Sequence, residues 1–194
     1  MNQRIVLRFL PLISSFLILS SCGGGTTGGG VAEFKTVTVS AQASTTVLES
    51  DVLKGNTCTA TGSTGGTFTT DTVDVVITSS KYPNFTGTLS PVEIDSYTIT
   101  FTPANVLSPP LPTLNGTSIG TTIAAGGSQT LHIPVAPDIL KYSLVNDKNL
   151  QLCSATMYTY FVTITFNGLE TNTGTRSTFE TSLNVAFADR TTTS

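Results

Sequence analysis

Cysteine and histidine, the residues best suited to metal binding and nucleophilic catalysis, are scarce in this chain of 194 residues. The three cysteines are Cys22, Cys58 and Cys153, and none has a second cysteine three positions along or a histidine nearby. Structural zinc sites and haem attachment both need such close spacings. The sequence therefore predicts no metal site and no cofactor.

The one histidine, His132, would have to serve any Ser-His-Asp or Cys-His arrangement. It is out of phase with Leu131 and Ile133 in an alternating segment, which is typical of a solvent-facing strand position. No Gly-x-Ser-x-Gly motif accompanies it. We expect no catalytic residues and no enzymatic activity, unless carboxylates converge across strands. The acids closest in sequence are the pairs Asp71 and Asp74, Glu49 and Asp51, and Glu93 and Asp95.

Strands must position whatever site exists, because apolar and polar residues alternate in several segments. The alternating segments are 37–43, 73–77, 96–102, 131–135, 158–166 and 179–187. The last two are joined by the polar, glycine-bearing stretch 167–175, which predicts a long hairpin. Weaker patterns cover 46–53 and 57–62. Residues 137–146 form either a short helix or another strand, and proline at the first turn favours the helix.

The fold class predicted from these segments is all-β, an antiparallel two-sheet sandwich of about seven to eight strands. Charged residues make up only 11% of the chain and the mean hydropathy is +0.20, values that argue against disorder. The domain resembles immunoglobulin and fibronectin-III sandwiches in architecture over about residues 33–189. Since tryptophan is absent and Cys58 and Cys153 are far apart, no family function is carried over.

The amino-terminal segment has the features of a bacterial export signal. Arg4 and Arg8 precede the apolar run 9–19, which is too short to span a bilayer. The run ends in Leu19-Ser20-Ser21-Cys22, which resembles the lipobox of bacterial lipoproteins. The resemblance implies cleavage after residue 21, acyl chains on Cys22 and a membrane anchor, with the outer membrane favoured because Gly23 is not acidic.

This resemblance divides the chain into four parts. Residues 1–21 are the signal peptide, 22–32 the lipidated cysteine with a glycine-rich tether, 33–189 the sandwich and 190–194 a polar tail. An oxidising compartment follows from export. Because Cys58 and Cys153 are the only thiols left there, we expect them to form a disulfide.

A proline-rich segment, 103–127, is long for a loop in a compact domain. We expect its aliphatic residues Val106, Leu107, Leu111 and Leu114 to contact a partner. The alternatives are that these side chains cover one open end of the core, or that 118–123 is an edge strand.

The net charge of −3 and the absence of a basic cluster after residue 8 argue against nucleic acid as a partner. Two functions remain. The favoured one is a non-catalytic, membrane-anchored lipoprotein for adhesion, scaffolding or envelope assembly, whose partner is another exported protein. The alternative is a module that binds a small ligand or surface glycan, using exposed aromatic residues such as Tyr82, Phe85 and Phe161.

Overall fold

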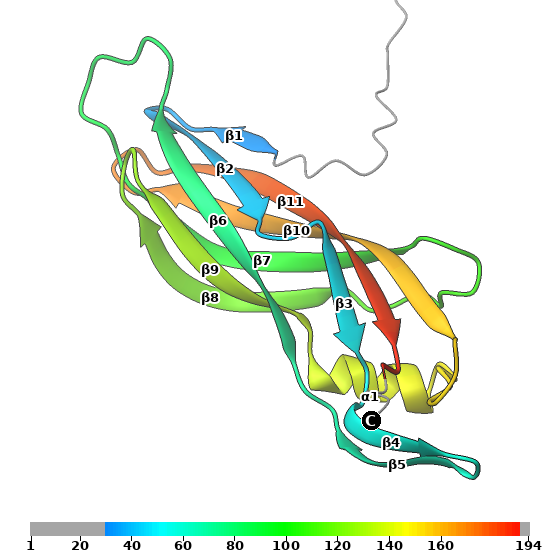
Figure 1. Cartoon of the computed structure of the whole chain (residues 1–194). Coiled ribbons are helices and arrows are strands. Elements are labelled where there is room, and N and C mark those ends of the chain that lie inside the picture. Colours follow the sequence, from blue (N-terminus) through cyan, green and yellow to red (C-terminus); the bar gives the residue numbers. More distant parts are fainter. Residues whose placement is uncertain (1–29, 191–194) are drawn as a thin grey trace, which may run out of the picture.

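Two β-sheets face each other in the computed structural model, which describes residues 30–190 and, within them, residues 117–119 by backbone alone (Figure 1). The four-stranded sheet has the order β1-β2-β6-β9, formed by β1 (Val31–Glu33), β2 (Val37–Ala43), β6 (Asp71–Lys81) and β9 (Ser128–Ala136). The five-stranded sheet has the order β3-β11-β10-β7-β8, formed by β3 (Val47–Asp51), β11 (Thr175–Ala188), β10 (Met157–Glu170), β7 (Val92–Pro103) and β8 (Leu114–Ile123). The predicted all-β sandwich is confirmed.

The strand order is that of an immunoglobulin-like sandwich. If β2, β6 and β9 are strands A, B and E, then β3, β11, β10, β7 and β8 take the places of A′, G, F, C and C′. The prediction of a wholly antiparallel sandwich needs one correction, because β3 pairs in parallel with β11. The Tyr158 hydroxyl, near the start of β10, donates a 2.8 Å hydrogen bond back to the Lys148 carbonyl, as in the tyrosine corner of such domains.

Side-chain alternation builds the core between the two sheets. Every second residue from Tyr158 to Phe166 is buried on β10, and β2, β6 and β9 bury theirs in the same way. Three phenylalanine or tyrosine rings meet toward the end of the core nearest the loop after β7, where Tyr160 packs edge-on against both Phe101 and Phe187. The opposite faces carry mainly threonine and serine, as the alternation predicts.

The predicted carboxy-terminal hairpin is confirmed as β10–β11, paired from Met157 with Ala188 to Glu170 with Thr175. It is longer than expected, since much of the stretch 167–175 continues the two strands. The sandwich also begins earlier than expected, because β1 includes Val31 and Ala32, which had been assigned to the tether. The predicted signal peptide (residues 1–21), Cys22 and residues 191–194 lie outside the described residues.

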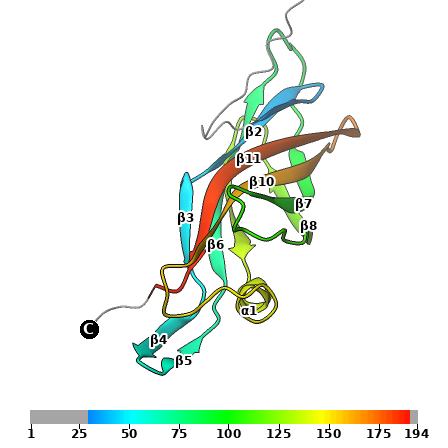
Figure 2. The same ribbon diagram turned by 90° about the vertical axis from the view of Figure 1, so that its right-hand side faces the viewer.

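One helix and one separate hairpin complete the fold at the same end of the molecule (Figures 1 and 2). The predicted helix is α1 (Asp138–Asn146), with Pro137 at its N-cap position. The hairpin, β4 (Lys54–Thr59) and β5 (Gly62–Thr67), forms a two-stranded sheet of its own.

Candidate functional site

The segment 103–127 is not one long loop. Strand β8 occupies Leu114–Ile123 at the edge of the five-stranded sheet, so the edge-strand alternative for 118–123 is confirmed. The remaining loop, residues 104–113, projects from one side of the molecule, between β7 and β8 (Figure 1). No residue in this loop is charged.

The four aliphatic residues predicted to contact a partner fall into two pairs. Val106 is fully exposed and Leu107 is 71% exposed. Leu111 and Leu114, in contrast, are half-buried and pack against the core, as expected for a cover over one end of the sandwich. Only the first pair offers an accessible apolar surface, so the expected four-residue contact surface is reduced to two.

The turn that carries Val106 and Leu107, here called the apolar tip (residues 104–108), is held by hydrogen bonds. The Asn105 side-chain carbonyl accepts from the backbone N–H groups of Leu107 (2.9 Å) and Ser108 (3.0 Å). The Asn105 amide nitrogen donates to the Thr159 hydroxyl at 2.7 Å. Thr159 N–H donates to the Ser108 hydroxyl at 2.8 Å and Ala104 N–H donates to the Thr159 carbonyl. The tip is thereby fixed to the central strand β10.

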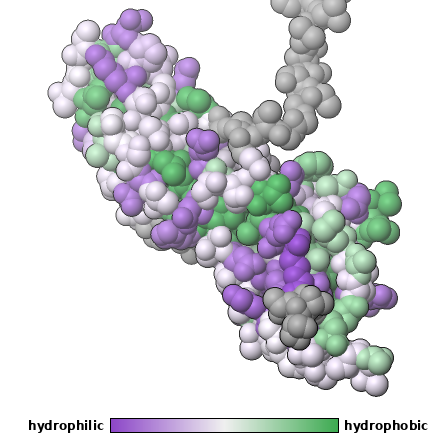
Figure 3. All heavy atoms as spheres, viewed as in Figure 1, coloured by the Kyte–Doolittle hydropathy of each residue, from purple (hydrophilic) through white to green (hydrophobic). Residues whose placement is uncertain are grey.

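Residues beyond the tip fix the loop further. The Tyr160 hydroxyl donates to the Pro109 carbonyl at 2.8 Å. Burial and the neighbouring Tyr158 raise the pKa of Tyr160 well above its usual range, so the hydroxyl keeps its proton and remains a donor. Phe161, also on β10, is 51% exposed on the outer face of the sheet and pairs with Thr102 just before the tip. Hydrophobic residues gather along this side of the molecule (Figure 3).

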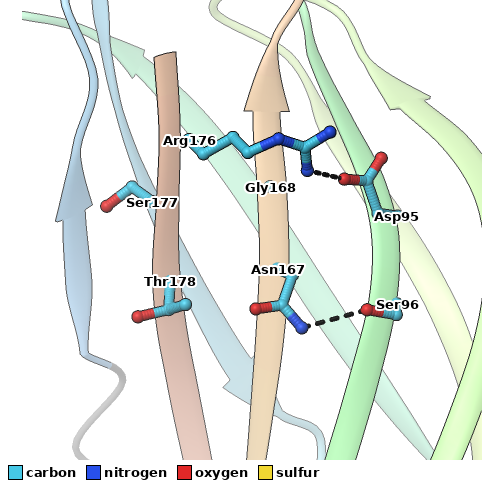
Figure 4. Close-up of a pocket in the computed structure, with 7 residues that line it drawn as sticks. All are labelled: Asp95, Ser96, Asn167, Gly168, Arg176, Ser177 and Thr178. Atoms are coloured by element: carbon cyan, nitrogen blue, oxygen red, sulfur yellow. Dashed lines mark hydrogen bonds and ion pairs between the residues drawn. The ribbon is translucent and has the colours of Figure 1, made fainter.

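A second feature is a polar depression of about 450 Å³ on the five-stranded sheet, lined by Asp95, Ser96, Asn167, Gly168, Arg176, Ser177 and Thr178 (Figure 4). The Arg176 guanidinium on β11 reaches across β10 to form an ion pair with Asp95 on β7. The Asn167 amide donates to the Ser96 hydroxyl at 2.9 Å. Each of these groups therefore already has a partner within the depression, although the exposed Arg176 guanidinium keeps further N–H donors free of these contacts.

A break in strand register creates this depression. The pairing of β7 with β10 shifts between Asn167 and Gly168, and Asp95 has no paired residue on either neighbouring strand. A bulge of this kind re-aims a side chain. The bulge at Asp95 interrupts the alternation between Glu93 and Asp95, which are two positions apart in the sequence.

The predicted disulfide is present between Cys58 on β4 and Cys153 in the loop before β10, with 5.5 Å between the α-carbons. It fastens the β4–β5 hairpin to the body of the domain. His132 is exposed, as expected, and its Nδ1 lies 2.5 Å from the Asp74 carboxylate on the adjacent strand. Among the hydrogen bonds of residues 30–190, no serine hydroxyl and no cysteine sulfur is bonded to the His132 ring or to the Asp74 carboxylate.

Sequence reasoning missed a buried carboxylate, Glu170, at the end of β10. Burial would raise its pKa, but hydrogen bonds from the hydroxyls of Thr173 and Thr36 and from the N–H groups of Thr36 and Lys35 together lower the pKa below its ordinary value. The signal was present in the sequence, because Glu170 is in phase with the buried residues Tyr158 to Phe166. Its hydrogen-bond partners are backbone N–H groups and threonine hydroxyls, so Glu170 holds the β1–β2 turn in place. The carboxylate is buried and is not accessible to a substrate.

Comparisons with known proteins do not assign this chain to a family. No protein-family model, no curated protein and no solved structure matches the chain. Between residues 30 and 190, no helix is long and apolar enough to cross a membrane.

Proposed function

We propose that this protein is a membrane-anchored lipoprotein of the bacterial envelope that binds another exported protein through its apolar tip and catalyses no reaction. The observation that carries the proposal is the pair Val106 and Leu107, exposed on a turn that is hydrogen-bonded to β10. Exposed aliphatic side chains on a fixed turn are unfavourable in the free protein and useful in a complex.

The fixed geometry favours binding because little conformational entropy is lost when a partner covers the tip. Full burial of valine or leucine contributes roughly 1.5–3 kcal/mol per side chain. Two such residues suit a protein contact of moderate affinity, and Phe161, exposed on β10 opposite Thr102, adds apolar surface where the loop begins. Proline at 109, 110 and 112 stiffens the backbone that follows.

The lipobox at Leu19-Ser20-Ser21-Cys22 supports the location. Several acyl chains on one residue suffice for stable anchoring, and the glycine-rich composition that follows Cys22 is typical of a tether. Adhesion, scaffolding and envelope assembly all fit a rigid domain presented in this way.

Binding of a polar ligand, such as a surface glycan, is the second candidate. The depression around Arg176, Asp95 and Asn167 supports it, because these groups can exchange their mutual hydrogen bonds for bonds to hydroxyl groups. Of the expected aromatic residues, Phe161 is exposed, whereas Tyr82 and Phe85 are half-buried in the loop after β6. None of the three lines the depression.

Site-specific photo-crosslinking in the native envelope tests the first proposal. A photoreactive amino acid replaces Leu107 in the lipidated protein, and a matched control replaces Ile139, which is 69% exposed on α1. We expect a discrete adduct from position 107 and none from position 139. The variant Val106→Asp/Leu107→Asp should lose the adduct from a photoreactive residue at Phe161 while its melting temperature stays unchanged.

Different substitutions in this loop should affect either the stability of the domain or the binding of a partner. Leu111→Asp should lower the melting temperature by several degrees, because it buries a charge against the core. If Val106→Asp/Leu107→Asp keeps the adduct, the tip is not the binding surface. If Arg176→Ala alone removes binding of envelope glycan, the second candidate replaces the first.

A further inference from the structure

Two sulfur atoms and a carboxylate meet where the β4–β5 hairpin joins the sandwich. Cys58 Sγ, Cys153 Sγ and a carboxylate oxygen of Asp189 all lie within 4.8 Å of one another. The two sulfurs are bonded to each other in this structure. Asp189 directly follows β11, so the three residues come from three different parts of the chain.

The Asp189 carboxylate is more than nine-tenths buried and only half satisfied. Its Oδ2 accepts hydrogen bonds from Cys153 N–H at 2.5 Å and from the Asn56 amide at 3.0 Å. Its Oδ1 is buried without a partner, and so is Oδ1 of Asn56, which is 5% exposed. None of the ion pairs formed by residues 30–190 includes Asp189. A buried, unpaired carboxylate oxygen is costly and suited to a cation.

We propose that the reduced form of this site binds one Zn²⁺ ion through Cys58 Sγ, Cys153 Sγ and the free oxygen of Asp189. Two thiolates and a carboxylate are ordinary zinc ligands. The fourth position of the tetrahedron is filled by the Asn56 carbonyl oxygen or by water.

The backbone already holds the ligands near the required separations. Around tetrahedral zinc, a thiolate sulfur and a carboxylate oxygen lie roughly 3.5 Å apart and two sulfurs roughly 3.8 Å apart. Cys58 Sγ lies 3.9 Å from Asp189 Oδ2, the hydrogen-bonded oxygen of the carboxylate whose other oxygen, Oδ1, is the proposed ligand. The cysteine α-carbons are 5.5 Å apart, so side-chain rotation can separate the sulfurs. The Asn56 amide and Cys153 N–H orient the carboxylate, as the outer partners of metal ligands do.

Reduction of the disulfide between Cys58 and Cys153 is balanced by oxidation of a dithiol reductant. The disulfide accepts two electrons and two protons and becomes two thiols, while the reductant is oxidised to its own disulfide. Zinc then binds as Zn²⁺ and displaces the two thiol protons to solvent. Cys58 is exposed, so both the reductant and the ion can reach the site.

The disulfide and the proposed zinc ion would each attach the same element, the β4–β5 hairpin, to the sandwich. The β4–β5 hairpin is rich in glycine and threonine, is largely exposed and pairs with no other strand. An isolated two-stranded hairpin is marginally stable in water. The disulfide in the oxidised form and the metal in the reduced form would both hold it against the sandwich.

Cobalt and zinc titrations of the full-length protein test this site. The oxidised protein is purified in detergent, reduced with a dithiol and freed of reductant under anaerobic conditions. We expect the reduced form to bind one equivalent of Co²⁺ with thiolate charge-transfer and tetrahedral absorption bands, which one equivalent of Zn²⁺ removes. The oxidised form should bind neither ion. Asp189→Asn should weaken zinc binding at least tenfold, whereas Asp147→Asn, at an exposed carboxylate, should change nothing.

Cys58→Ser is the matched variant for folding, since reduced wild-type protein also lacks the disulfide. It should lose the cobalt bands with unchanged far-ultraviolet circular dichroism. The proposal is overturned if reduced wild-type protein gives no tetrahedral cobalt spectrum, or if Asp189→Asn or Cys58→Ser binds zinc as tightly as wild type does. Failure of Asp189→Asn to fold leaves the Cys58→Ser comparison to decide. None of these outcomes depends on the apolar tip.

Discussion

Alternation along β10 places one charged residue, Glu170, inside the sandwich. Its hydrogen-bond partners explain how a carboxylate can be buried there. Glu170 continues the buried phase of β10 beyond Gly168, and it is fully enclosed. Because residues 167–175 are polar and contain glycine, the sequence alone predicts a connecting stretch there. The backbone N–H groups that bind the Glu170 carboxylate belong to the β1–β2 turn, which is more than 130 positions away in sequence. Spacing within one strand cannot reveal such a partner.

Glu170 should make the stability of the fold depend on pH in the acid range. Its pKa in the folded protein lies below its ordinary value of 4.5, so the stabilisation is fully present above that value. It is lost as the pH falls through the lower, folded-state pKa. Glu170→Gln should lower stability by about 1–3 kcal/mol at neutral pH, because the amide cannot accept all of these hydrogen bonds. Melting temperatures between pH 7 and pH 3 should therefore fall less steeply for the variant than for wild type, and parallel curves would contradict this assignment.

Lys141 presents the opposite case, a fully buried ammonium group on α1. Its Nζ lies 2.7 Å from Asp71 Oδ2 and donates to the Asp51 carbonyl at 2.9 Å, so it ties the helix to β6 and β3. Proline at the first turn favours a helix over 137–146 and so includes Lys141 in it, but nothing in the sequence predicts that Lys141 is buried.

Breaking this pair from one side should cost more than replacing both partners. Asp71→Asn leaves the buried ammonium without its counter-charge, and we expect a loss of about 3 kcal/mol, since Asp71 itself is partly exposed. Lys141→Met in the Asp71→Asn background should recover part of that loss. A denaturation double-mutant cycle measures the coupling, and strictly additive effects would show that the pair is not coupled.

At the scale of elements, segments with strong alternation of apolar and polar residues are the strands that pack across the core. Segments with weak alternation correspond to strands that do not pack across it. Strand β8 lies in the segment 103–127, whose proline and glycine content favours a loop, with an edge strand over 118–123 as the alternative. Gly116 is required by packing, since a β-carbon there would lie 2.0 Å from the Tyr97 ring. An aromatic ring over a strand glycine is a contact between two strands. The parallel pairing of β3 with β11 likewise depends on the whole topology and not on local sequence.

The β4–β5 hairpin should lose its order before the sandwich does when its covalent link is removed. The bond between Cys58 and Cys153 closes a loop of 95 residues, for which chain entropy gives an upper figure of about 4.7 kcal/mol. In metal-free buffer, Cys58→Ser/Cys153→Ser should lower the melting temperature and increase amide hydrogen exchange in Lys54–Thr67. Exchange in β10 and β11 should remain slow. Uniformly faster exchange throughout residues 30–190 would mean that the disulfide supports the sandwich as a whole.

At the scale of the molecule, the sandwich acts as a spacer between the point where the chain enters it and the apolar tip. Gly30 N–H donates to the Glu180 carbonyl, and Glu180 pairs with Thr165 on β10. The tip is bonded to Thr159, six residues away on the same strand. At about 3.3 Å per residue, this places the tip roughly 20 Å from the entry point. A partner bound at the apolar tip, as proposed, would therefore be held at a distance from Gly30 that β10 sets.

Anchoring should depend on Cys22 alone. Cys22→Ser removes the thiol that would carry the diacylglyceryl group, and the apolar run 9–19 is too short to replace it as a transmembrane span. We expect the variant to appear in the soluble fraction outside the cytoplasm, without incorporation of labelled palmitate, and with the same melting temperature as wild-type protein. Gly24→Ser, in the tether, is the matched control and should remain in the membrane fraction with its label. Retention of the unlabelled Cys22→Ser protein in the membrane would contradict the lipoprotein assignment and would require another membrane contact, for which the apolar tip would then be the first surface to test.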